Sequence, residues 1–322
     1  MPNVVALCGG VGGSKLAEGL QQCLAQGRLR IIVNTGDDFV HRGLPVCPDL
    51  DTVLYTLAGV AHPQQGWGRA GETWQVQGQW SEMGLETWFQ LGDRDIALHL
   101  HRSELKLRGE TLTRITADLA RRFGVRTELL PMCDGPAPTV VETESGELSF
   151  QEYFVKHRAE PRVRGFRYGA AGGVPMTGEV REALRDGSAD AIILCPSNPY
   201  LSLAPILAVP GLRNLLAHSA APVVAVSPVI GDFAFKGPTA KIMRELGTAV
   251  SSLEIARQYR DFLDAMIIDE TDSTLLEARE EGDPALFTGK IRMNGPEERR
   301  SLAGACLDLA AALRGADAGR NS

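Results

Sequence analysis

The strongest constraint on the fold is an apolar run that passes through a glycine turn into a helical pattern. Residues 3–8 (NVVALC) are expected to form a short strand that ends at Gly9. A helix should follow from about Ser14, because leucines recur there on one face. Residues 30–34 (RIIVN) are expected to form a second strand. This order is typical of the start of a parallel α/β sheet.

The same pattern returns in the second half of the chain. Apolar runs end in polar or turn residues at 191–195, 223–227 and 265–269, and helices are expected near 177–186, 209–217, 239–247, 252–263 and 296–314. In the first half, Asp49 can N-cap a helix that runs to about Val60. Strands that alternate with helices in this way predict a parallel sheet covered by helices.

The middle of the chain has a different composition. Residues 61–80 are rich in Gly, Gln and Trp and predict a loop, whereas residues 92–123 predict two helices. Residues 138–150 alternate around a Ser-Gly turn, which predicts a hairpin. The predicted domains are a core formed by residues 1–60 and 166–322, and an insertion, residues 61–165, that builds one wall of the site.

Composition excludes several classes of protein. Hydrophobic residues make up 44% of the chain and charged residues 23%, which excludes a disordered or collagen-like chain. The chain has 33 Lys and Arg against 40 Asp and Glu, a formal charge of −7. A general nucleic-acid binder would carry a basic face, so no nucleic-acid partner is expected. A small phosphorylated ligand stays compatible with this charge, because a local site can be basic on an acidic protein.

The cysteines and the N-terminus predict a cytoplasmic protein. The six cysteines are scattered without metal-ligand spacing, which fits a reducing compartment. The first residues show no basic region followed by an apolar stretch and a cleavage site, so no signal peptide is expected. No apolar run approaches the ~20 residues that span a bilayer, so no membrane contact is expected.

The glycine loop CGGVGGSKL joins the first strand to the first helix. Successive glycines let backbone N–H groups approach an anion, and the helix N-terminus adds about half a positive charge. The loop is not a Walker A sequence, because Ser14 precedes Lys15, and Lys15 stands where a dinucleotide fingerprint has its third glycine. A tight turn without a ligand is the alternative. We predict a phosphate bound by Gly10, Gly12, Gly13 and Ser14, with Lys15 nearby.

An acidic segment, residues 34–52 (NTGDDFVHRGLPVCPDLDT), follows the second strand. In an open α/β sheet, ligands bind beyond the carboxyl ends of the strands, and carboxylates beside a phosphate commonly hold magnesium. We predict a magnesium site formed by Asp49 and Asp51, with help from Asp37 or Asp38. The first two can converge only if Asp49 lies outside the helix or at its cap. A helix cap, a turn or a ribose-binding acid is the simpler alternative for each residue.

Two later turns are candidates for nucleotide binding. The rigid turn PSNP follows a strand and presents Ser197 and Asn198, which are good hydrogen-bonding groups. The segment after the next strand supplies Lys236. We include Asn34 and Thr35, which open the acidic segment, among the substrate-binding residues.

Two features of the insertion have both a functional and a structural interpretation. The sequence LGDRD places Asp93 and Arg94 at a helix start, where they can act on a ligand or can cap the helix and form a surface ion pair. Trp67 lies in a glycine-rich loop, where a flat aromatic ring can stack on a ring ligand or pack into the core.

The motifs GGVGGSKL, NTGDD, CPDLDT, GWG with ETW, LGDRD, PSNP and SPVIG occur in this order. Together they closely resemble the 2-phospho-L-lactate transferase family of coenzyme F-420 biosynthesis, from the N-terminus to about residue 270. The combination of PDLDT, LGDRD and PSNP is specific, whereas the glycine loop alone is not. With this resemblance, the predicted fold class is α/β: a Rossmann-like parallel sheet with helices on both faces and an inserted, mostly helical subdomain with a hairpin.

The resemblance implies a magnesium-dependent transferase that acts as a homodimer. Such an enzyme moves a phospho-acid from a guanylyl-diphospho-acid donor to the ribityl hydroxyl of the deazaflavin Fo and releases GMP. The acid is phospholactate, phosphoenolpyruvate or phosphoglycerate, and the motifs do not indicate which. The donor's diphosphate would lie on the glycine loop, and its guanosine would reach toward Ser197 and Asn198.

The resemblance also places the acceptor against the PDLDT segment. Asp51 is therefore the first candidate to polarise the acceptor hydroxyl. Asp93 and Arg94 come next, because Arg94 can offer forked donors to the developing phosphate charge and Asp93 can orient it. The deazaflavin ring would lie against the loop that contains Trp67.

Two other protein classes share part of this pattern. A non-catalytic UDP-sugar-binding regulator of the same superfamily has a similar glycine loop and acidic segment, but is not expected to carry both PDLDT and LGDRD. A nicotinamide dehydrogenase should have a cleaner third glycine and a single ribose-binding acid.

Overall fold

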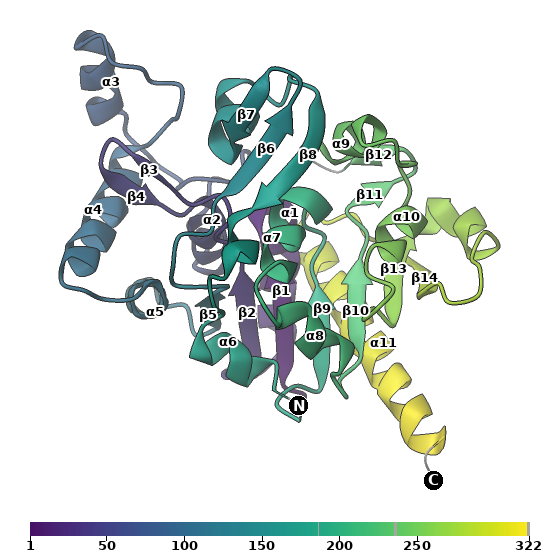
Figure 1. The fold of residues 1–322 in the computed structure, drawn as a ribbon. Coiled ribbons are helices and arrows are strands. Elements are labelled where there is room, and N and C mark those ends of the chain that lie inside the picture. Colours follow the sequence, from purple (N-terminus) through teal and green to yellow (C-terminus); the bar gives the residue numbers. More distant parts are fainter. Residues whose placement is uncertain (186, 235–236, 321–322) are drawn as a thin grey trace.

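The structure is a computed structural model of the 322-residue chain, and it describes residues 1–185, 187–234 and 237–320. Its centre is a seven-stranded parallel sheet with the strand order β14-β13-β10-β9-β1-β2-β5 (Figure 1). Helices cover both faces of the sheet. The predicted α/β class with a Rossmann-like parallel sheet is confirmed.

Each central strand is an almost continuous apolar run because both of its faces are covered. On β1, Val4 and Ala6 pack into one core, whereas Val5 and Leu7 pack into the other. The strands of this sheet are β1 (Val4–Cys8), β2 (Leu29–Val33), β5 (Glu128–Pro131), β9 (Ala191–Leu194), β10 (Val223–Val226), β13 (Ala265–Asp269) and β14 (Ala285–Gly289).

Two sets of helices complete these cores. One core takes apolar side chains from α1 (Gly10–Cys23), α2 (Pro48–Leu57), α5 (Leu112–Arg122) and α11 (Pro296–Arg320). The other core takes them from α6 (Gly178–Ala183), α7 (Ala204–Leu207), α8 (Leu212–Ala217) and α10 (Ser252–Arg257).

Two helix starts differ from the prediction in ways that matter for the site. Helix α1 begins at Gly10 and not at Ser14, so the glycines form its first turn. The prediction that Asp49 N-caps its helix is wrong, because Cys47 is the N-cap of α2 and Pro48 is the first helical residue. Proline suits that place, since the first N–H of a helix has no partner within the helix.

The predicted insertion contains the expected helices and hairpin. Besides α5 it carries α4 (Asp93–Leu107), which confirms the two helices predicted for residues 92–123, and a further helix, α3 (Gln75–Glu82). The hairpin of β6 (Thr139–Thr143) and β7 (Gly146–Ser149) is also confirmed. A third strand, β8 (Val163–Tyr168), pairs with β6 and was not expected.

The boundaries of the insertion are less simple than the sequence suggested. Strand β5 lies inside residues 61–165 and pairs with β2 in the central sheet. Strand β8 crosses the predicted boundary at residue 165. The division into a core and an insertion stays a prediction, and the central sheet takes one strand from the segment assigned to the insertion.

The carboxyl edge of the central sheet is covered by these additions. Figure 1 shows β6, β7 and β8 above that edge, with α3 projecting furthest to one side. A hairpin of β3 (Phe39–His41) and β4 (Leu44–Val46) rises from the acidic segment. The remaining elements are β11 (Val229–Ile230), β12 (Phe233–Ala234), α9 (Thr239–Glu245) and helical turns at Glu152–Lys156, Gly169–Gly172, Pro199–Leu203 and Glu270–Leu276. In the described part of the chain, no helix has the length and apolarity needed to cross a membrane.

Candidate functional site

A buried asparagine joins two of the predicted carboxylates. Asn34, directly after β2, donates through Nδ2 to Asp37 Oδ1 at 3.1 Å and to Asp49 Oδ2 at 2.9 Å. The same nitrogen lies 3.3 Å from the Leu201 carbonyl oxygen, and Asn34 Oδ1 accepts from the Gly36 N–H at 2.7 Å. Asn34, Asp37 and Asp49 therefore form one buried polar cluster at the carboxyl edge.

The Asp49 carboxylate lies at the N-terminus of α1. The Gly10 backbone N–H and the Ser202 hydroxyl hydrogen-bond to it. A Cβ atom on Gly9 would overlap Asp49 Oδ2, so the approach requires glycine at that position. A negative group is stabilised by the positive end of a helix. The helix end that was predicted to bind a phosphate thus already carries a carboxylate.

Burial raises the pKa of the carboxylates in this cluster. The pKa of Asp49 is raised to about 6 and that of Asp38 to about 8. The pKa of Asp37 is raised well above its usual range by burial and then by the charge of Asp49. Asp38 Oδ1 is buried without a hydrogen-bond partner in the described residues. The cluster is therefore short of positive charge, and its oxygens are of the kind that a hard divalent cation prefers.

The four predicted metal ligands do not form a ready coordination sphere. Within residues 1–185, 187–234 and 237–320, no three His, Cys, Asp or Glu side chains already converge as a metal-binding group. Asp49 and Asp51 both lie inside α2, two positions and so about 200° apart around its axis. The condition under which these two side chains could converge is therefore not met.

Asp51 points away from the cluster and toward α4. Its Oδ2 accepts from Arg102 Nη1 at 3.1 Å, and its Oδ1 accepts from Arg102 Nη2. Both side chains are buried. The predicted roles of Asp51, as a metal ligand and as the group that polarises the acceptor, stay predictions, although both of its oxygens already bond the guanidinium.

The turn PSNP packs directly on the glycine loop. Ser197 Oγ accepts from the Gly9 N–H at 3.0 Å and donates to the Gly9 carbonyl oxygen at 2.9 Å. A Cβ atom on Gly12 would lie 2.5 Å from the Pro196 carbonyl oxygen, and one on Gly13 would overlap Ser197 Oγ. The glycines are thus required by loop packing, and their role in binding a phosphate stays a prediction.

Asn198 holds the next turn in place. Its Oδ1 accepts from the backbone N–H groups of Tyr200 and Leu201, at 2.9 and 3.0 Å. Its Nδ2 donates to Thr239 Oγ1 at 3.0 Å, at the start of α9. Asn198 therefore joins two loops at the carboxyl edge, and its contact with a guanosine stays a prediction.

The other predicted ligand-binding side chains have partners inside the protein. Ser14 Oγ donates to a carbonyl oxygen of its own helix at 3.0 Å. Lys15 Nζ donates to the Met293 carbonyl oxygen at 3.1 Å. Thr35 Oγ1 lies 3.5 Å from a cysteine sulfur. Lys236 lies outside the described residues.

Helix α4 carries a buried polar stripe that the sequence analysis missed. Asp95, His99 and Arg102 recur at helical spacing on one face, and all three are buried. Tyr55 of α2 donates its hydroxyl to Asp95 Oδ1 at 2.7 Å. Burial raises the pKa of Asp95 to about 7 and lowers that of His99 to about 4. The sequence does contain this pattern, because three polar residues on one helical face predict either a solvent-exposed face or a buried hydrogen-bond network.

Asp93 and Glu72 form a reciprocal pair of helix caps. Asp93 accepts from the backbone N–H groups of Gln75 and Val76 at 3.1 Å each, at the start of α3. Glu72 accepts from the N–H groups of Arg94 at 2.8 Å and of residue 95 at 3.0 Å, at the start of α4. Asp93 therefore does cap a helix, and it is the neighbouring helix α3. Its predicted catalytic role is not tested by this geometry.

Arg94, on α4, contacts the segment that carries Trp67. Arg94 Nη1 donates to the Ala70 carbonyl oxygen at 3.0 Å. Trp67 lies on a short loop closed by pairing of Ala61 with Arg69, and 41% of its surface is exposed. The exposed ring is available to a ligand, and stacking on it stays a prediction.

Loss of the Glu72 cap should destabilise the segment that carries Trp67. We expect Glu72→Ala to lower the free energy of unfolding by about 1 kcal/mol, because two N–H groups at the start of α4 lose their acceptor. Urea unfolding followed by tryptophan fluorescence measures this change. The matched control is Glu281→Ala, at an exposed glutamate outside the helices. Equal stability of both variants would contradict the capping role.

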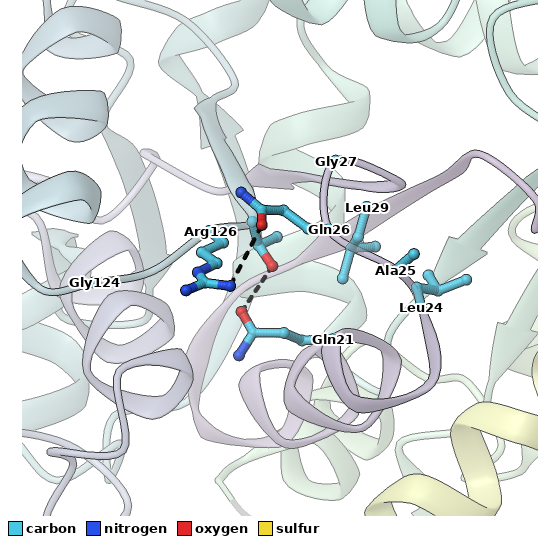
Figure 2. Close-up of a pocket in the computed structure, with 9 residues that line it drawn as sticks. Gln21, Leu24, Ala25, Gln26, Gly27, Leu29, Gly124 and Arg126 are labelled. Atoms are coloured by element: carbon cyan, nitrogen blue, oxygen red, sulfur yellow. Dashed lines mark hydrogen bonds between the residues drawn. The ribbon is translucent and has the colours of Figure 1, made fainter.

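One cavity lies away from the carboxyl edge. It has a volume of about 280 Å³ and is lined by residues at the end of α1 and before β2 and β5, among them Gln21, Gln26 and Arg126 (Figure 2). These positions lie at the amino ends of the strands. None of the predicted site residues lines this cavity.

Comparison with known proteins identifies relatives over almost the whole chain. The family model for 2-phospho-L-lactate transferase CofD matches residues 4–292. The chain is 39% identical over 318 residues to a phosphoenolpyruvate transferase from Streptomyces griseus, with 97% of this chain and 99% of that protein covered. It is 38% identical over 269 residues to a 2-phospho-L-lactate transferase from Methanosarcina mazei, with 84% and 88% covered.

A solved structure supports the fold. A crystal structure of a UPF0052 family member from Bacillus halodurans superposes with a TM-score of 0.60 at 17% identity, covering 95% of this chain and 99% of that one. At this identity the likeness bears on the fold alone. The family match and the two transferases, taken with the motifs at the carboxyl edge, show that the chain belongs to the 2-phospho-L-lactate transferase CofD family.

Proposed function

We propose that this protein transfers a phospho-acid from a guanylyl-diphospho-acid donor to the ribityl hydroxyl of the deazaflavin Fo, with release of GMP, in coenzyme F-420 biosynthesis. Family membership and relatives named as 2-phospho-L-lactate and phosphoenolpyruvate transferases support this assignment. The observation that carries it is the meeting of the glycine loop, the Asn34 cluster and the PSNP turn at one edge of the sheet. This edge is where open α/β sheets bind ligands.

A divalent cation fits the electrostatics of this edge. Asp49 already lies at the positive end of α1, so a phosphate brought to the glycine loop would be repelled at close range. A magnesium ion held by Asp37 and Asp49, with Asp38 beside them, would offset both charges. Such an ion would supply positive charge that stabilises the negative phosphate oxygens. Asp51, the fourth predicted ligand, bonds Arg102, so the proposal rests on the other three.

The protein's own side chains then position the reactants. Asn34 orients Asp37 and Asp49, and the interlocked glycine and PSNP loops hold a rigid wall beside them. Asp93 and Arg94 stay the predicted residues of the acceptor side, and the segment bearing Trp67 would exclude water from the donor. A homodimer and a cytoplasmic location are part of the same proposal, and light scattering of the purified protein tests the dimer.

A turnover assay tests the proposed function. The purified chain is incubated with Fo and, in turn, with guanylyl donors that carry phospholactate, phosphoenolpyruvate or phosphoglycerate, with magnesium or with a chelator. The expected result is equimolar GMP and phosphodiester product with at least one donor, and loss of both under chelation. Tight binding of a UDP-sugar without turnover of any donor would instead support the regulator class.

A further inference from the structure

Arg102 is a buried permanent charge that no motif of the sequence marked. Its side chain is 2% exposed and is among the largest fully buried side chains of the described residues. Arginine keeps its proton in proteins, so burial requires an anionic partner with matching geometry. Asp51 supplies that partner through two parallel bonds, from Nη1 to Oδ2 and from Nη2 to Oδ1.

Two further contacts fix the guanidinium. Nη1 donates to the Pro45 carbonyl oxygen at 3.1 Å, on β4. Nη1 also lies 3.0 Å from His99 Nδ1. Because a guanidinium can only donate, His99 Nδ1 accepts, and the ring hydrogen of a neutral His99 is then on Nε2. Arg102 thus joins α4 to the first turn of α2 and to the β3–β4 hairpin.

These contacts connect Arg102 both to the Asn34 cluster and to the loop that carries Trp67. On α2, Asp51 is two residues from Asp49, which binds Asn34 at the carboxyl edge. On α4, Arg102 lies on the same rigid helix whose start binds Glu72 of the loop bearing Trp67. A displacement of the ion pair would therefore change the distance between the Asn34 cluster and that loop.

We infer that Arg102 is a positioning residue that acts through Asp51: the pair sets α4 and its loop against the start of α2, and Asp51 is neither the base nor a metal ligand. This inference rests on the proposed function only for its kinetic consequences. In an enzyme that joins two substrates, a misplacement of about 1 Å lowers turnover by about 10²-fold. Arg102 is not part of the Asn34 cluster, where we propose that the guanylyl donor binds, so the affinity for that donor should change little.

The experiment compares four variants with the wild type. Arg102→Lys keeps the positive charge but cannot form the two parallel hydrogen bonds of the guanidinium. Arg102→Met removes the charge. Asp51→Leu combined with Arg102→Met removes both charges at similar volume, which buried ion pairs often tolerate. Arg108→Met, at the exposed C-cap of the same helix, is the matched control. Measured quantities are kcat, the acceptor KM, the affinity for GDP as a donor probe, and urea unfolding.

The expected result is a split between the two substrates. Arg102→Lys should lower kcat over acceptor KM by about 10- to 10²-fold per folded molecule, with GDP affinity within about threefold of the wild type. The double variant should recover at least about tenfold over Arg102→Met. A double variant as inactive as the single variant, at full GDP affinity, would assign Asp51 a direct role and overturn the inference. Wild-type kinetics in Arg102→Lys, or a parallel loss of GDP affinity, would overturn it as well.

Urea unfolding separates this inference from the proposed function. If the wild type turns over no donor, the proposed function fails, and the ion pair is still tested. In that case the double variant should unfold at a higher urea concentration than Arg102→Met, which leaves Asp51 buried and unpaired. A double variant that unfolds at the same or a lower urea concentration than Arg102→Met would then show that the pair does not position these helices.

Discussion

Replacement of Asp49 by asparagine is expected to lower turnover by about 10²- to 10³-fold while the chain stays folded. The change is isosteric, but it removes one negative charge from the cluster that we propose for magnesium. It also places an amide where Asn34 Nδ2 and the Gly10 N–H both require an acceptor. Only one oxygen remains for these donors and for Ser202, so donor binding and catalysis should both weaken.

The stability of this variant should move in the opposite direction. Burial raises the pKa values of Asp37 and Asp49, and the charge of Asp49 raises that of Asp37 further, so the ionised pair destabilises the folded state at pH 8. The melting temperature of Asp49→Asn at pH 8 should therefore equal or exceed that of the wild type. A loss of activity together with a gain of stability is typical of a residue retained for function.

The assay and a matched substitution decide between these effects. Turnover, GDP affinity and melting temperature are measured with and without magnesium. Asp261→Asn, on the surface beside Arg213, is the control and should leave turnover unchanged. Turnover of Asp49→Asn within about threefold of the wild type, with an intact magnesium requirement, would exclude Asp49 from the metal site.

The central sheet could be predicted because its strands carry a local signal. Strands such as β1 and β13 are buried on both faces, so they are continuous apolar runs that any window detects. The β3–β4 hairpin had no such signal. Its turn, Arg42-Gly43, has positive φ at both positions, and an arginine there does not mark the turn as Asn-Gly would.

The candidate site could be predicted only in part, for a related reason. The motifs located Asn34, Asp37 and Asp49, because these residues follow a strand end. They did not reveal that Asp51 turns away, since that depends on Arg102, 51 positions later on another helix. Side-chain direction on a helix follows from its start, and the N-cap of α2 was predicted at Asp49, two residues after Cys47, where the structure has it. A single error of position thus changed which carboxylates were expected to meet.

The folded protein without metal should lose stability as the pH rises from 6.5 to 8. In this range the unfolded chain has ionised its aspartates, whose pKa is about 3.9. Burial raises the pKa of Asp38 to about 8 and that of Asp95 to about 7, so the folded chain binds more protons. The free energy of unfolding therefore decreases with rising pH, by about 2 kcal/mol over this window.

Histidine sets the lower limit of that window. Burial lowers the pKa of His99 to about 4, so above pH 6.5 it is neutral in the folded state and mostly neutral in the unfolded state. Below pH 6.5 the unfolded chain protonates His99 before the folded chain does. This makes the free energy of unfolding increase with pH there, which opposes the effect of the buried carboxylates. Measurements confined to pH 6.5–8 thus report the buried carboxylates.

Urea unfolding at three pH values in this window, in the presence of a chelator, measures the slope. Asp38→Asn should reduce the slope, because it removes one raised pKa from the cluster. Asp118→Asn is the control. Burial opposes the shift there, but bonds to His101 and Arg122 lower the pKa of Asp118 to about 2, well below the window. A flat or rising stability in the wild type would contradict the raised pKa values.

Magnesium should flatten the same slope in the wild type. A cation held by Asp37 and Asp49 requires ionised carboxylates, so it competes with the protons that stabilise the metal-free protein. Stabilisation by a fixed magnesium concentration should therefore increase from pH 6.5 to pH 8. In Asp49→Asn this increase should be small, because one of the two principal ligands is gone. A pH-independent effect of magnesium on the wild type would place the ion away from the buried carboxylates.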